Sequence, residues 1–166
     1  MRIAFAGTPL AAVPTLTALL ASDHEVALVV TRPDAPAGRG RTLTASPVAE
    51  VAGVSGVPVL KTSHLAEHKD KFADVDCVVV VAFGAMVPRE LLDVPKHGWI
   101  NVHFSLLPQW RGAAPVQYSI LSGDEFTGVT TFRIDEGLDT GPMLAYLTTQ
   151  IAPNETSSEL LDRLSI

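Results

Sequence analysis

The sequence lacks the features that mark several classes of protein. Cys77 is its one cysteine, so no disulfide can form within the chain and a reducing compartment is expected. No apolar run approaches the roughly 20 residues that a membrane-spanning helix needs, and no signal-peptide segment precedes the first strand pattern. Because Cys77 stands in an apolar run, we expect a small buried thiol. These absences favour a cytoplasmic protein with no membrane association.

Charge is also sparse, at 18% of residues, and acidic residues outnumber basic ones by 18 to 12, which gives a net charge of −6. Such a balance argues against a general nucleic-acid binder. With 47% hydrophobic residues among 166, the chain has the composition of one globular domain with a sizeable core. The last residues read as the start of a helix capped by Thr156, without a stop signal. We therefore expect the chain to be part of a longer protein.

Short apolar runs alternate with helical patterns, which predicts an α/β fold built on parallel strands. Two later strands, at residues 128–134 and 143–151, have a short connection and should pair as an antiparallel hairpin. Gly7 follows the first strand without the further glycines of a dinucleotide fingerprint, so we expect it to serve a tight turn and do not expect NAD binding. The earlier strands are predicted at residues 2–6, 25–31, 57–60, 76–82 and 99–102.

Residues 32–47 form a long connection rich in proline and glycine that contains Arg32, Arg39 and Arg41. It is much longer than the roughly two to six residues usual between a strand and a helix. On composition alone it is either a solvated mobile loop or a clamp for a phosphate backbone. His64 and His68 are four residues apart but have no third candidate ligand, so no metal site is predicted.

The densest group of chemical side chains lies between residues 99 and 115. Asn101 and His103 are two residues apart, so on a strand both side chains leave the same face. An amide can hold a developing oxyanion and an imidazole can move a proton near neutral pH. Asp139, in the turn between the last two strands, could reach His103 and hold or charge its ring. The alternative is that Asn101 caps a turn, His103 is a core histidine and Asp139 only shapes its turn.

These motifs together resemble a known family. Asn101-x-His103, the run Ser105-Leu106-Leu107-Pro108 and the glycine-flanked Asp139 are similar to the folate-dependent formyltransferases. The runs 110–115 and 36–40 narrow the resemblance to the methionyl-tRNA formyltransferase family. The resemblance implies a Rossmann-like, mostly parallel twisted sheet with helices on both faces and a C-terminal antiparallel hairpin. It also implies that residues 1–166 are a formyltransferase catalytic domain, and that the family's C-terminal OB-like domain is absent from this chain.

The same resemblance implies an activity and a set of site residues. The family transfers a formyl group from 10-formyltetrahydrofolate to the α-amine of methionyl initiator tRNA, without a metal, and we expect a monomer. Asn101, His103 and Asp139 match its catalytic trio. The residues expected to bind folate are Ser105, Leu106, Leu107, Pro108, Phe83, Gly84, Ala85, Met86 and Val87. Those expected to meet the tRNA are Arg32, Arg39, Gly40 and Arg41.

Two positions depart from the family pattern. Phe104 replaces a small residue and is expected to alter the shape of the folate pocket. Gln109 replaces a basic residue and is expected to remove one tRNA contact.

Three alternatives stay open. A formyltransferase for glycinamide ribonucleotide would be expected to carry a glycine- and serine-rich phosphate loop after the first strand, which residues 7–11 do not offer. An amino sugar nucleotide enzyme would have little use for the arginine-bearing connection. A folate-binding domain or a 10-formyltetrahydrofolate hydrolase would need water in place of the amine, and the sequence does not exclude it.

Overall fold

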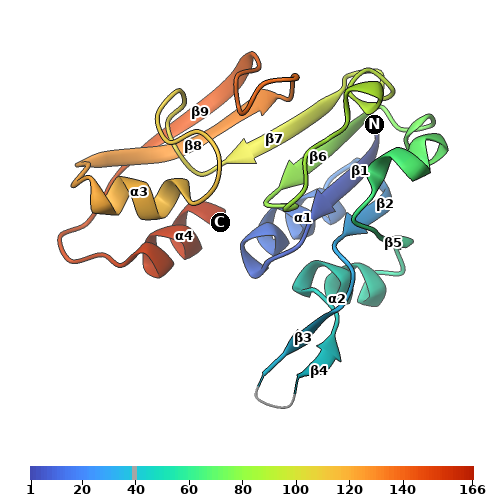
Figure 1. Cartoon of the computed structure of the whole chain (residues 1–166), viewed down its shortest axis with the longest axis horizontal. Helices are drawn as coiled ribbons and strands as arrows, with labels where there is room; N and C mark the ends of the chain where they lie inside the picture. The colour runs from blue at the N-terminus through green and yellow to red at the C-terminus, as the bar shows by residue number, and fades with distance from the viewer. Residues whose placement is uncertain (39–40) are drawn as a thin grey trace. The chain divides into compact units, whose positions relative to one another are not determined.

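The computed structural model describes residues 1–38 and 41–166 (Figure 1). The chain divides into two compact units, Met1–Trp99 and Ile100–Ile166, which are described separately below. Among the described residues, no helix is both long and apolar enough to cross a membrane.

The first unit is built on a parallel sheet. Its strands are β1 (Arg2–Gly7), β2 (Glu25–Thr31), β5 (Val59–Lys61) and β6 (Cys77–Val81), in the order β5-β2-β1-β6. Each neighbouring pair in that order is parallel, as the alternation of strand and helix patterns predicts. The side chains of β1 and β6 form the core, and Cys77 among them is a free, buried thiol as expected. Burial raises the pKa of the Cys77 thiol, so it stays protonated.

Short helices connect these strands. They are η1 (Leu10–Ala12), α1 (Val13–Leu20), α2 (Pro47–Val54), η2 (Leu65–Phe72) and η3 (Arg89–Leu91). The N-cap of α2 is Ser46, whose hydroxyl accepts a 3.1 Å hydrogen bond from the Ala49 amide. Because strand crossovers are right-handed, the step back from β5 to β6 puts η2 on the sheet face opposite α1 and α2. The fold therefore has helices on both faces of the parallel sheet.

The long arginine-bearing connection is more regular than predicted. It contains a small antiparallel hairpin of β3 (Ala35–Ala37) and β4 (Thr42–Thr44), which stands out from the sheet of its unit (Figure 1). Lys61 on β5 forms a 2.6 Å ion pair with Asp34, at the base of this hairpin. The expectation of a loop without secondary structure was therefore wrong, because three-residue strands are too short to give an alternating sequence pattern.

The second unit is an antiparallel sheet with helices. Strands β7 (Trp99–His103), β8 (Phe126–Arg133) and β9 (Met143–Gln150) pair in sequence order, which confirms the predicted hairpin. Helices α3 (Pro115–Leu121) and α4 (Ser157–Ser165) complete the unit. A Cβ atom at Gly128 would lie 1.9 Å from the carbonyl oxygen of Leu147, so only glycine permits the spacing of β8 and β9 there.

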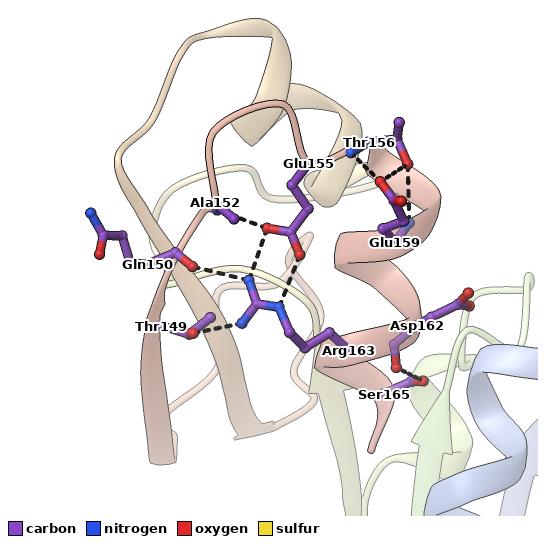
Figure 2. Close-up of polar contacts among 9 residues, drawn as sticks. All are labelled: Thr149, Gln150, Ala152, Glu155, Thr156, Glu159, Asp162, Arg163 and Ser165. Atoms are coloured by element: carbon purple, nitrogen blue, oxygen red, sulfur yellow. Dashed lines mark hydrogen bonds and ion pairs between the residues drawn. The ribbon is translucent and has the colours of Figure 1, made fainter.

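Helix α4 is held by two sets of polar contacts (Figure 2). The predicted cap, Thr156, forms a capping box with Glu159. Arg163 pairs with Glu155 at 2.9 Å and also donates to the Thr149 hydroxyl and the Gln150 carbonyl at the end of β9. The Glu155 side chain is only 9% exposed, and its hydrogen bonds with Arg163 lower the pKa of that carboxyl below its ordinary value.

We predict that Glu155→Gln loosens α4 in a pH-dependent way. The folded pKa of Glu155 is lowered, so its contribution is present above the ordinary pKa of a glutamate and is lost as the pH falls through the lowered value. At neutral pH the substitution should reduce hydrogen-exchange protection of α4 by about 1 kcal/mol or less. Once the pH is below the lowered pKa of Glu155, the variant and the unchanged chain should converge.

The matched control is Asp162→Asn on the same helix, which removes an exposed carboxylate and should change protection little. Equal loss in the two variants at neutral pH would mean that net charge, not the contact with Arg163, stabilises α4.

Candidate active site

Asn101 and His103 lie on β7, and the alternation of the strand directs both side chains to the same face, as predicted. His103 pairs in register with Thr130 of β8, and Asn101 pairs with Phe132. The imidazole of His103 is 6% exposed and meets the Phe132 ring edge-on, with centroids 6.4 Å apart. The sheet therefore holds the histidine in a largely dry position.

The proton on His103 has a defined place. Its Nε2 atom lies 2.8 Å from the carbonyl oxygen of Trp110. Because a carbonyl can only accept, Nε2 carries the hydrogen and the lone pair of the neutral ring lies on Nδ1. That Nδ1 atom lies 3.6 Å from Oδ2 of Asp139, which is longer than a normal hydrogen bond. A proton taken up at Nδ1 would therefore form an ion pair with Asp139.

The Asp139 carboxylate is fixed by the turn that contains it. Its Oδ2 accepts a 2.7 Å hydrogen bond from the Gly112 amide, and the side chain is 16% exposed. The Asp139 backbone has φ +50°, a left-handed conformation that costs a non-glycine residue free energy and often marks a functional position. A Cβ atom at Gly141 would lie 1.8 Å from the Arg133 carbonyl, so the turn can close only with glycine there. The structure thus brings Asp139 beside His103, as the sequence suggested.

The Asn101 side chain differs from those of His103 and Asp139. It is half-buried, and within residues 1–38 and 41–166 its side chain has no hydrogen-bond partner. An amide with an open donor and acceptor beside a histidine suits a ligand that carries a polarised carbonyl. The arrangement can stabilise negative charge on an oxygen and accept a proton from a nearby amine.

The run Ser105-Leu106-Leu107-Pro108 follows His103 directly and is held by the hydroxyl of Thr130. That hydroxyl donates to the Ser105 carbonyl at 2.7 Å and accepts from the Leu107 amide at 3.1 Å. The Ser105 side chain in turn donates to the Gln109 carbonyl at 2.6 Å. The sequence analysis did not identify Thr130. The one feature that could have indicated it is a polar residue at a buried position of a strand pattern. Phe104 beside this run is buried, and Gln109 is exposed.

The other predicted folate segment, residues 83–87, belongs to the first unit. The Phe83 ring is 1% exposed and therefore part of the core, while the Phe83 carbonyl accepts a 2.9 Å bond from the Thr8 hydroxyl. Met86 is 68% exposed, and Gly84 has φ +83°. Ala85 and Val87 are half-buried. The Phe83 ring therefore anchors the segment in the core, and residues 84–87 present small and apolar groups at the surface.

The predicted tRNA-binding residues are only partly described. Arg32 is half-buried, and its backbone amide lies 3.4 Å from the Thr8 hydroxyl. Arg41 is exposed, whereas Arg39 and Gly40 lie outside the described residues. Within the part of the chain that the structure describes, no group of three or more histidine, cysteine or acidic side chains could hold a metal ion. His68 lies at a kink in η2, with φ −123°, so His64 and His68 do not share a regular helix face.

Comparison with known proteins agrees with this fold. Residues 1–165 match the formyl transferase family model, and the chain belongs to that family. A methionyl-tRNA formyltransferase from Streptomyces griseus is 56% identical over 170 residues, covering 99% of this chain and 55% of the relative. The chain thus spans about half the length of the curated relatives it matches.

Solved structures show the same fold. A phosphoribosylglycinamide formyltransferase from Bacillus halodurans superposes with a TM-score of 0.83 at 24% identity, over 99% of this chain and 87% of that one. A sugar 3N-formyl transferase, studied in the presence of dTDP and 5-N-formyl-THF, gives a TM-score of 0.76 at 21% identity, over 99% and 57%. These likenesses confirm the Rossmann-like α/β fold with its C-terminal antiparallel hairpin.

We predict that Thr130→Val weakens the run that follows His103. Valine has nearly the same shape but cannot bond the Ser105 carbonyl or the Leu107 amide, which would lose a partner in a buried place. Urea unfolding should show a loss of about 2 kcal/mol or more, with faster hydrogen exchange at Leu107.

The control is Thr131→Val at the next position of β8. The Thr131 hydroxyl makes one 3.3 Å bond to the Ala145 carbonyl from a less buried position, so this change should cost under about 0.5 kcal/mol. If both variants lose the same stability, the Thr130 hydroxyl does not hold the run.

Proposed function

We propose that the protein transfers a formyl group from 10-formyltetrahydrofolate to the α-amine of methionyl initiator tRNA. The observation that carries the proposal is that His103 Nδ1 lies 3.6 Å from the Asp139 carboxylate. The strand that bears His103, β7, also presents the open amide of Asn101. The high identity to a methionyl-tRNA formyltransferase supports the choice of acceptor. The neighbours among solved structures are under 25% identical and support the fold alone.

In the proposed reaction, the amine nitrogen forms a bond to the formyl carbon and the bond from that carbon to the folate nitrogen breaks. Asn101 donates from its amide to the formyl oxygen as negative charge develops there. His103 takes the proton that the amine loses at Nδ1, and Asp139 stabilises the resulting imidazolium. The same proton then passes to the departing folate nitrogen, so the site ends as it began.

We assign binding of the folate co-substrate to two segments. Ser105 to Pro108 follow His103 directly and are held rigid by Thr130. Residues 83–87 supply small and apolar groups suited to a flat ring. Membership of the formyl transferase family supports a formyl-folate as the donor. We propose no metal in this reaction.

Recognition of tRNA is assigned to the hairpin of β3 and β4 and its flanks, with Arg32, Arg39, Gly40 and Arg41. The chain carries a net charge of −6, so phosphate contacts have to come from a local basic group such as this one. We further propose that the protein works as a monomer in the cytoplasm, and that an OB-like domain found in the intact family members adds tRNA contacts.

The test is formyl transfer from 10-formyltetrahydrofolate offered in parallel to methionyl initiator tRNA, glycinamide ribonucleotide, an amino sugar nucleotide and water. The assay is run on this chain and on a hybrid that adds the C-terminal half of the Streptomyces griseus relative. Formylated methionyl-tRNA from the chain or the hybrid, and no other product, supports the proposal. Formylation of a small amine, or equal release of formate in every reaction, would overturn it.

We predict that His103→Ala lowers turnover of the active form at least ~10²-fold, because the proton acceptor is lost, while affinity for tRNA stays nearly unchanged. The measurement is single-turnover formyl transfer together with a tRNA binding assay. His64→Ala, which removes an exposed histidine of the first unit, is the control and should retain normal turnover. Near-normal turnover in His103→Ala would exclude His103 from the mechanism.

A further inference from the structure

A second set of contacts lies behind His103. The carbonyl that accepts from His103 Nε2 belongs to Trp110, and the side chain of Trp110 is itself held at two points. Its indole Nε1 donates a 2.6 Å hydrogen bond to Oδ2 of Asp124, in the turn before β8. Its ring stacks on Tyr118 of α3, with centroids 5.8 Å apart and planes 11° from parallel.

The backbone of Trp110 requires such support. Its φ is +56°, in the left-handed region that a bulky residue rarely adopts. This conformation is unfavourable for a residue with a side chain and persists only where surrounding contacts hold it. The bond to Asp124 and the stack on Tyr118 are those contacts. They therefore fix the direction of the Trp110 carbonyl, and the carbonyl fixes which ring nitrogen of His103 carries hydrogen.

We infer that Asp124, acting through the indole and carbonyl of Trp110, is a positioning residue that sets the tautomer of His103. A charge-assisted hydrogen bond of 2.6 Å is among the strong ones, so the carboxylate is well suited to this task. With Nε2 committed to Trp110, the lone pair of His103 stays on Nδ1 beside Asp139. Asp124 thus acts through Trp110 on the Nε2 side of the His103 ring and sets which nitrogen carries the hydrogen. Asp139 lies on the Nδ1 side and stabilises a positive charge on the ring.

This inference rests on the proposed function only for its kinetic consequence. The rate of formyl transfer should depend on Asp124 because a ring with its hydrogen on Nδ1 cannot take the amine proton there. The tautomer itself can be measured in the protein without any substrate. The claim about the His103 tautomer and the claim about the rate of formyl transfer can therefore fail separately.

The first measurement is ¹⁵N NMR of the histidine rings at a pH where His103 is neutral, with its signals assigned by their loss in His103→Ala. In the unchanged chain, Nε2 should carry the hydrogen. In Asp124→Ala the two tautomers should both be populated. Asp124→Asn keeps an oxygen acceptor for the indole and should restore the original pattern.

Two further variants separate positioning from general loss of structure. Trp110→Phe keeps a ring to stack on Tyr118 but lacks the indole N–H, so it should reproduce Asp124→Ala even where that variant folds poorly. Glu125→Ala, in the same turn, removes an exposed carboxylate and should leave the His103 signals unchanged.

The kinetic measurement uses whichever form shows transfer. Asp124→Ala and Trp110→Phe should lower kcat by about tenfold to a hundredfold with little change in KM, and Asp124→Asn should stay close to normal. Unchanged His103 tautomers in both Asp124→Ala and Trp110→Phe would overturn the inference. A changed tautomer in a protein that formylates none of the acceptors would uphold it and reject the proposed function.

Discussion

The second unit depends on one constraint, the fixed orientation of the His103 ring between two acceptors. Nε2 is committed to the Trp110 carbonyl and Nδ1 faces Asp139, whose carboxylate is tied in turn to the Gly112 amide. Residues 104–114 and 134–142 are irregular segments far apart in sequence, and these contacts join both to β7. Without them, the histidine would still be buried, but its lone pair would have no defined direction.

Strand β8 is the scaffold on which this constraint is built. Phe132 meets the His103 ring, Thr130 holds the run after His103, and Gly128 allows β9 to approach. Each of these three residues contacts a segment outside β8, which a strand pattern alone does not reveal. A site built on a paired strand is held more accurately than one built on loops, which suits chemistry that requires atoms placed within a fraction of an ångström.

The sequence predicted what local patterns determine. Strand and helix alternation gave the α/β class, the Thr156 cap gave the start of the last helix, and the two-residue spacing of Asn101 and His103 gave their shared face. What it missed depends on contacts between distant segments. The hydroxyl of Thr130, the indole of Trp110 and the carboxylate of Asp124 acquire their roles only when the chain has folded. The segment after Pro88 forms only the short η3, and Trp99 donates to the Leu91 carbonyl and so ties that segment to the core.

The site and the choice of acceptor pose separate physical problems. In the proposed reaction, Asn101, His103 and Asp139 act on the formyl oxygen of the donor and on one proton of the amine, and both would be the same for any primary amine. We infer that selection comes from groups outside the trio. In a chain of net charge −6, we propose that the arginines around β3 and β4 distinguish a polyanionic tRNA from a small amine.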